Sequence, residues 1–148
     1  MAEEIAKEKK KRRKKVKTGV NSKSKRKMAT ARATITAGKG SIKVNSRGIE
    51  TIESKYLQEI ATEPLALAPE LAKTVDIDVR VEGGGFMGQA IASRAAIAKA
   101  LLAFTKDEKL RKKFIAYDRL MVVDDPRRVE SKKPLGKKAR KKKQKSKR

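Results

Sequence analysis

The chain has 148 residues, enough for one domain of ordinary size, and a formal net charge of +24. It contains neither Cys nor His. Disulfides, thiol catalysis, zinc sites built from Cys or His, and any His-based general base are therefore excluded. An enzyme that uses carboxylates or Lys is still possible, but the acidic residues are scattered, and we expect no enzyme, no metal, no cofactor and no small-molecule substrate.

The positive charge is concentrated at the two ends of the chain. Residues 1–27 carry +10 and residues 131–148 carry +11, whereas residues 28–130 carry only +3. Segments this polar cannot bury enough apolar surface to offset the entropy of ordering them. The composition therefore predicts a basic N-terminal extension over 1–24 that is disordered when free, a globular domain over 25–130, and a basic tail over 131–148.

Cationic arms have three usual partners or roles: nucleic acid, an anionic membrane surface, or solubility. Closely spaced phosphates release counterions for each charge they meet, which favours nucleic acid. No apolar run approaches the ~20 residues of a membrane span, and the arms lack the apolar face of an interfacial helix. We therefore expect no membrane partner.

Two alternating runs open the predicted domain. Residues 28–36 (MATARATIT) end in alternating Thr and Ile, and residues 41–45 (SIKVN) alternate again. The Gly38-Lys39-Gly40 sequence between them is typical of a turn. This pattern predicts an antiparallel hairpin made of the two runs.

The middle of the chain predicts short helices and one strong strand. Residues 54–61 are helical with Ser54 as the N-cap, and Pro64 begins a further helical segment that Pro69 divides. Residues 74–82 (TVDIDVRVE) place Val and Ile on one face and charged residues on the other. This alternation predicts a strand with one covered face.

The last third of the domain reads as helical. Residues 86–104 are rich in Ala and repeat apolar side chains at the helical period, and residues 106–116 predict another helix. The short apolar run 120–123 predicts an edge strand. Together the elements predict an α+β fold with two layers, in which helices cover one face of a mixed sheet.

A glycine turn separates the strong strand from the long helix, and it consists of Gly83, Gly84, Gly85 and Gly88. Three of these glycines match G-x-G-x-x-G, and Asp107 lies about twenty residues further on. In a dinucleotide site that acid follows a strand, but Asp107 lies between two predicted helices, so a nucleotide-using enzyme is a weak alternative. Two interpretations stay open: a sharp turn with close backbone packing, or N–H groups offered to an RNA phosphate.

The five aromatic residues are not spaced along a strand as a base-stacking platform requires. A reader of single-stranded bases is therefore disfavoured. If the partner is RNA, we expect recognition through backbone and shape.

Several short motifs follow one another in order: Lys25-Arg26-Lys27, Ala31-Arg32-Ala33, Gly38-Lys39-Gly40, Asp76-Ile77-Asp78-Val79, the Gly83–Ala90 stretch GGGFMGQA, Tyr117-Asp118-Arg119, Asp125-Pro126-Arg127-Arg128 and Ser146-Lys147-Arg148. Together they resemble the ninth small-subunit ribosomal protein family, in its archaeal and eukaryotic branch. The resemblance covers the chain from about Lys25 to the terminus, and residues 1–20 match nothing in the family. Lys147 stands where that branch usually has an aromatic residue.

The resemblance implies a two-layer α+β fold with a left-handed βαβ crossover, where the general rule favours a right-handed one. It also implies a non-enzymatic structural protein of the cytoplasmic ribosome, bound to rRNA and to neighbouring proteins in the head of the small subunit. By matching position, the end of the tail would contact the peptidyl-site tRNA through Lys145, Lys147 and Arg148. A free nucleic-acid chaperone or compaction protein is the alternative, because it would use the same arms.

The expected rRNA-binding residues are cations of the domain and the tail. In chain order they are Lys25, Arg26, Lys27, Arg32, Lys39, Arg94, Arg127, Arg128, Lys132, Lys133, Lys137, Lys138, Arg140 and Lys141. For Arg94, a solvated helix face is an equally consistent interpretation.

Overall fold

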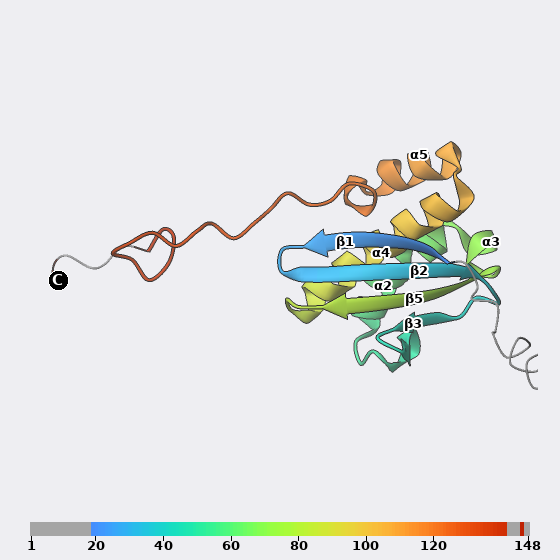
Figure 1. Ribbon diagram of the computed structural model, residues 1–148, viewed down its shortest axis with the longest axis horizontal. Helices are drawn as coiled ribbons and strands as arrows, with labels where there is room; N and C mark the ends of the chain where they lie inside the picture. The colour runs from blue at the N-terminus through green and yellow to red at the C-terminus, as the bar shows by residue number, and fades with distance from the viewer. Residues whose placement is uncertain (1–18, 142–145, 147–148) are drawn as a thin grey trace, which may run out of the picture.

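The computed structural model describes residues 19–141 and Ser146. Within these residues, five strands, four α-helices and two 3-10 helices form the domain (Figure 1). In chain order they are β1 (Val20–Arg26), β2 (Ala29–Ala37), β3 (Ile42–Val44), β4 (Arg47–Gly48), η1 (Ile49–Thr51), α2 (Lys55–Leu67), α3 (Pro69–Ala72), β5 (Val75–Glu82), α4 (Phe86–Thr105), α5 (Glu108–Tyr117) and η2 (Arg119–Met121).

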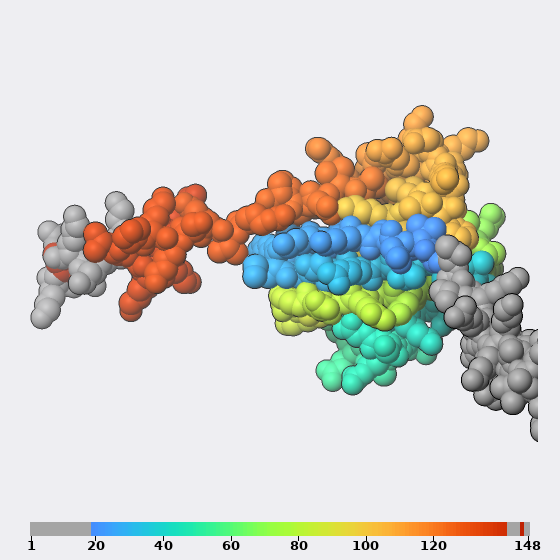
Figure 2. All heavy atoms as spheres, in the orientation of Figure 1, coloured from blue at the N-terminus to red at the C-terminus, as the bar shows by residue number. Residues whose placement is uncertain are grey.

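The strands form one mixed sheet in the order β1-β2-β5-β3-β4. All neighbouring strands are antiparallel except β3 and β5, which are parallel. Helices α2 and α4 lie behind the sheet in the view of Figure 1, and α5 lies above them, beyond β1. The front face of the sheet is uncovered in the space-filling view of Figure 2. The predicted class, a two-layer α+β fold with helices on one face, is confirmed.

The core lies between the sheet and α4. Ala29, Ala31, Ala33 and Ile35 of β2 are buried, as are Val75, Ile77, Val79 and Val81 of β5. Because α4 presents Ala92, Ala96 and Ala100 to the same cluster, its backbone can approach the small residues of β2 closely. Each of the larger buried side chains, such as Ile77 or Phe114, contributes roughly 1.5–3 kcal/mol through removal of apolar surface from water.

The parallel pair β3 and β5 is joined by a left-handed crossover. In Figure 1 strand β5 points to the left and lies above β3, and the connection passes through α2 behind the sheet. A path that leaves β3, crosses behind the sheet and returns above it has the left-handed sense, against the general preference. The handedness agrees with the fold that the family resemblance implies.

The predicted hairpin between residues 28–36 and 41–45 is wrong, because β5 lies between β2 and β3. The Gly38-Lys39-Gly40 loop crosses the start of β5 instead of closing a hairpin. The Asp76 carboxylate accepts hydrogen bonds from the backbone N–H groups of Lys39 (2.9 Å) and Ser41 (3.0 Å). Strand alternation shows that two segments are strands, but it does not say which strands are neighbours.

The folded domain begins earlier than the predicted boundary at Lys25. Residues 20–24, which we assigned to a disordered extension, form most of β1 and pair with β2. Between Val20 and Arg26, the inward positions of this strand hold Ser22 and Ser24 rather than apolar residues. Ser22 donates a hydrogen bond to the backbone carbonyl of Ala96 at 2.5 Å, so polar contacts with α4 replace the apolar signal that sequence patterns detect.

Two smaller corrections concern the helices. Helix α2 continues through Pro64, whose ring is buried in its last turn, and only Pro69 divides the segment. Residues 120–123 do not form an edge strand, because the Asp118 carboxylate caps a 3-10 turn at Leu120 N–H (2.8 Å) and Met121 is fully buried. The strand of residues 74–82 and the helices of residues 86–104 and 106–116 are confirmed as β5, α4 and α5, with ends that differ by one or two residues.

Among residues 19–141, no helix combines the length and the apolar character that crossing a membrane requires. The same residues hold no group of three or more acidic side chains placed to bind a metal ion.

Candidate nucleic-acid interface

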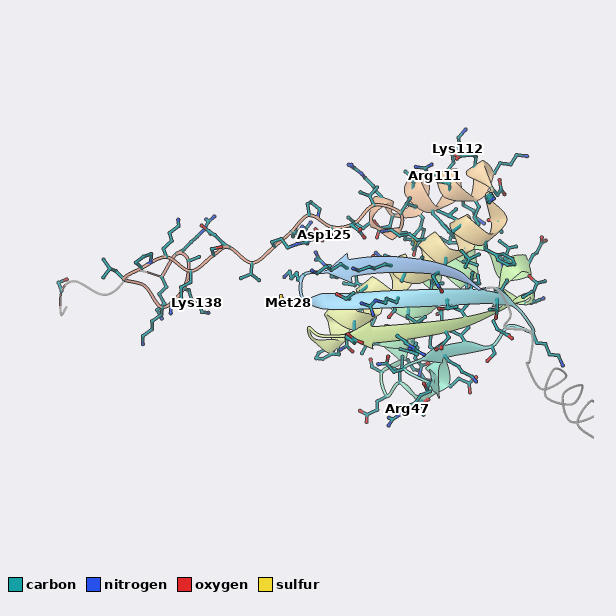
Figure 3. All side chains as sticks on the ribbon, in the orientation of Figure 1. Met28, Arg47, Arg111, Lys112, Asp125 and Lys138 are labelled. Carbon is teal, nitrogen blue, oxygen red and sulfur yellow. The ribbon has the colours of Figure 1, made fainter. Side chains whose placement is uncertain are left out.

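The C-terminal arm leaves the domain at one end of the sheet. Met28, in the turn between β1 and β2, and Asp125, at the start of the arm, lie at this same end in Figure 3. The glycine turn after β5 also lies there, since its backbone packs on Met28 and Ala29. We call this end of the sheet the tail end, and residues 124–128 the tail root.

An ion pair ties the tail root to β1. The Arg26 guanidinium contacts the Asp125 carboxylate, which is only 5% exposed. The same carboxylate accepts a hydrogen bond from the Arg127 backbone N–H (2.8 Å), and Arg128 donates to the Asp125 carbonyl (3.0 Å). Arg26 was predicted to bind rRNA, but its guanidinium is occupied within the fold.

The preceding residue, Asp124, also ties the tail root to the domain. Asp124 accepts hydrogen bonds from the Lys99 ammonium of α4 (2.5 Å) and the Ser24 hydroxyl of β1 (3.1 Å). Burial alone would raise the pKa of the Asp124 carboxyl. The Lys99 hydrogen bond and charge, with help from Ser24 and the Lys25 backbone amide, outweigh burial and hold that pKa below its ordinary value of 3.8. We call the contacts of Asp124 and Asp125 with Ser24, Arg26 and Lys99 the clasp.

Sequence reasoning missed the clasp, because it used Asp125 only as part of the Asp125-Pro126-Arg127-Arg128 motif. The available signal was the pair Asp124-Asp125 itself. Two adjacent acids between an apolar run and a basic arm indicate that their carboxylates form ion pairs with cations from other parts of the fold.

The glycine turn has a packing role that the structure shows directly. Gly83 and Gly84 have φ values of +71° and +67°, which favour glycine. A Cβ on Gly83 would lie 2.7 Å from the Met28 carbonyl oxygen, and one on Gly84 would lie 2.9 Å from the Ala29 nitrogen. Close packing against the β1–β2 turn therefore requires both glycines, and Gly88 is also near Ala29.

The enzyme alternative finds no support at this turn. Asp107, the acid that would face a ribose, is instead the N-cap of α5, where its carboxylate accepts a hydrogen bond from Lys109 N–H (2.8 Å). Helix α4 begins at Phe86 with no side-chain cap on its N-terminal N–H groups. A phosphate contact at that helix start stays a prediction.

Arg94 is used inside the domain. Its guanidinium pairs with Glu63 of α2 at 2.7 Å and with Asp118, the residue that caps η2. The side chain is 13% exposed. Arg94 therefore joins three elements of the helical layer, and its predicted contact with rRNA stays a prediction.

The remaining predicted cations fall into separate regions. Lys25, Lys27, Arg127 and Arg128 are exposed at or near the tail end. Arg32 is exposed in the middle of the open sheet face, and Lys39 follows β2, at the opposite end of the strand from Lys27. The structure thus brings the basic residues of the tail end together and leaves Arg32 and Lys39 apart from them.

Beyond the root the chain runs outward as a narrow arm (Figures 1 and 2). Glu130 pairs with Lys133 (3.4 Å) and with Arg140 (2.9 Å), which brings the far part of the arm back towards its start. All of its predicted rRNA-binding cations are exposed: Lys132, Lys133, Lys137, Lys138, Arg140 and Lys141. The predicted tRNA contacts Lys145, Lys147 and Arg148 lie outside the described residues.

The fold and its charges define a small basic α+β protein with an extended cationic arm, a class suited to contact with polyanions. A family model described as "Ribosomal protein S9/S16" matches residues 24–148. The chain is 47% identical over 116 residues to "Small ribosomal subunit protein uS9" of Pyrobaculum aerophilum, covering 78% of this chain and 82% of that protein. It is 43% identical over 104 residues to the protein of the same name from Methanococcus vannielii, covering 70% and 78%.

The chain therefore belongs to the ribosomal protein S9/S16 family. This membership confirms the family that the sequence motifs indicated. It gives the chain a structural, non-enzymatic role in the cytoplasmic ribosome.

Proposed function

We propose that this protein binds rRNA in the head of the small ribosomal subunit, and that the end of its C-terminal arm contacts the peptidyl-site tRNA. The named relatives are proteins of the small subunit, which supports the location. The observation that carries the proposal is the clasp. It holds the start of a strongly cationic arm against β1 and α4, so the arm leaves the domain in a set direction.

The clasp also separates this function from that of a free nucleic-acid chaperone. A chaperone uses its cationic arms on many RNAs and gains little from a fixed exit direction. A protein that must reach one site within a large particle does gain, because a directed arm loses less conformational entropy on binding.

The proposed rRNA contacts are the exposed cations of the tail end and the arm. At the tail end these are Lys25, Lys27, Arg127 and Arg128. All four side chains are exposed, unlike that of Arg26, which forms a largely buried ion pair with Asp125. Along the arm the cations contact the RNA backbone, and no aromatic side chain after Tyr117 offers a surface for base stacking.

Removal of the last four residues tests the tRNA contact. Subunits that carry a chain lacking residues 145–148 should assemble normally and should retain tRNA at the peptidyl site several-fold less well, because three cations are lost. The control is Lys109→Gln, Lys112→Gln and Lys113→Gln together on α5, which removes the same charge from the helical layer. If the truncation impairs assembly and leaves tRNA affinity unchanged, the arm anchors rRNA only.

Sedimentation tests the ribosomal role itself. The full chain should migrate with small subunits through a gradient at moderate salt. A chaperone would dissociate and remain near the top, and that result would overturn the proposal.

A further inference from the structure

Cations from three strands lie side by side on the uncovered face of the sheet, a grouping that the sequence pattern alone does not show. On β1 and β2, Lys23 is directly opposite Arg32, and on β2 and β5, Arg32 is directly opposite Arg80. All three side chains are exposed. With neighbouring strands about 4.8 Å apart, the row spans roughly 10 Å across the sheet. We call these residues the cation row.

The row is electrostatically unfavourable in the isolated protein. Like charges directly opposite one another on a sheet are destabilising. Within residues 19–141, no carboxylate forms an ion pair with any member of the row. A surface that served only solubility would gain from alternating charge, so this arrangement indicates an anionic partner.

Two carboxylates of the same face lie in the rows next to the cation row, and Asp76 lies one row further out, opposite Thr36. Asp78 is opposite Thr34 on one side of the row, and Glu82 is opposite Thr30 on the other. Lys43 is opposite Asp78 on β3, and Lys25 is opposite Thr30 on β1. Asp78 and Glu82 therefore each share a row with a lysine, and the cation row in the centre has no acid of its own.

The cation row also lines a hollow. A shallow depression of about 660 Å³ is bounded by the three cations together with polar residues that include Asn21, Thr34 and Asp78. The Thr34 hydroxyl donates a hydrogen bond to the Asn21 side-chain oxygen at 2.8 Å. No aromatic side chain lines the depression, so stacking on bases is not available there. Guanidinium groups fit phosphate oxygens with two hydrogen bonds, which makes phosphate the best matched ligand.

We propose that Lys23, Arg32 and Arg80 bind the phosphate backbone of an rRNA strand that lies across the open face of the sheet. The proposal rests on the proposed function, since it takes the RNA to be rRNA of the small-subunit head. It adds a second RNA contact in the centre of the sheet, separate from the tail end and from the arm.

Binding of the full chain to a transcript of the head rRNA, measured against salt concentration, tests the proposal. The double variant Arg32→Gln/Arg80→Gln should bind about tenfold more weakly or worse, and its slope of log K against log salt should fall by roughly one to two. The matched control Lys109→Gln/Lys112→Gln removes two charges from α5, where Lys112 lies on the helical layer (Figure 3), and should change affinity less than twofold. The thermal midpoint of Arg32→Gln/Arg80→Gln should be equal to or above that of the wild type, which excludes misfolding as the cause.

The outcomes separate the two proposals. If the wild type binds the transcript and both double variants lose affinity equally, the cation row has no special role, although the ribosomal function stands. If the wild type neither binds the transcript nor migrates with small subunits, the proposed function fails and the row proposal fails with it.

A tethered probe gives a second measurement that leaves the row intact. Because the chain has no Cys, Thr30→Cys places a single hydroxyl-radical probe on the open face, and Lys112→Cys places one on α5. In assembled subunits the probe at Thr30→Cys should cleave head rRNA strongly and the probe at Lys112→Cys should give a different and weaker pattern. Absence of cleavage from position 30 in assembled subunits would overturn the proposal.

Discussion

The tail end and the open face of the sheet differ in whether their cations are paired with carboxylates. In the clasp, Arg26 is matched with the buried Asp125, and Lys99 with Asp124. On the open face, no described carboxylate forms an ion pair with Arg32 or Arg80. A matched cation holds the fold together, and an unmatched one is available to a partner. The identity of a residue as Arg or Lys does not distinguish these roles.

This comparison predicts that removal of a charge will have opposite effects on stability in the two regions. Loss of Asp125 leaves the largely buried Arg26 guanidinium without its partner, which is strongly destabilising. Loss of a cation-row residue relieves repulsion in the free protein. The following substitutions test the contrast in order of decreasing effect.

Asp125→Ala should cause the largest loss. Arg26 would remain partly buried without its carboxylate, and the free energy of unfolding should fall by about 2–4 kcal/mol. Urea denaturation of the full chain measures the change. The double variant Arg26→Met/Asp125→Ala should recover part of the loss, because it removes the unmatched charge. A loss below about 0.5 kcal/mol, the usual range of surface substitutions, would show that the ion pair does not hold the root.

Gly84→Ala should come next, because the tail end depends on close packing as well as on charge. The new Cβ would lie 2.9 Å from the Ala29 backbone nitrogen, and the alanine would have to keep a positive φ. We therefore expect the free energy of unfolding to fall by about 1–3 kcal/mol. The control is the adjacent Gly85→Ala, where a Cβ has no neighbour within 4 Å and φ is −104°. Equal effects at the two positions, measured by urea denaturation, would contradict the packing role of the turn.

Asp124→Asn should have a smaller effect that depends on pH. The side chain of Asp124 is 54% exposed, so solvent screens its pair with Lys99 and the loss at pH 7 should be at most about 0.5–1 kcal/mol. Because the folded-state pKa of Asp124 is lowered, its contribution is present above the ordinary value of 3.8 and is lost as the pH falls through the folded-state pKa. Stability curves of the wild type and the variant should therefore converge in acid. A constant difference down to pH 2 would assign the effect to packing.

Arg80→Thr should have the smallest effect and the opposite sign. The variant keeps a residue suited to a strand and removes repulsion with Arg32, so the free protein should gain about 0.2–0.5 kcal/mol. The gain should shrink as salt is added, because salt screens exposed charges. A loss of stability at low salt would show that Arg80 is matched within the domain, and it would weaken the comparison.

Much of the secondary structure followed from local patterns. The alternation of Val and Ile in β5 and the helical repeat of α4 were readable because each element buries one regular face. Strand β1 was not recognised, because Ser22 and Ser24 occupy its inward positions and their value lies in contacts with Ala96 and Asp124. The insertion of β5 between β2 and β3 was also missed, because alternation carries no information about neighbours.

The sequence by itself determined the class of this protein. The chain has a nearly neutral domain, basic ends, and neither Cys nor His, and its short motifs follow the family order from Lys25 onward. These features were enough to indicate a non-enzymatic ribosomal protein. Only the tertiary structure showed which cations are paired with carboxylates inside the domain and which are not. Arg26 and Arg94 form ion pairs with carboxylates from distant parts of the chain. By contrast, Lys23, Arg32 and Arg80 lie opposite one another on three neighbouring strands. The physical reason is that a charge takes its role from its neighbours in space, and those neighbours are set by strand order and helix packing.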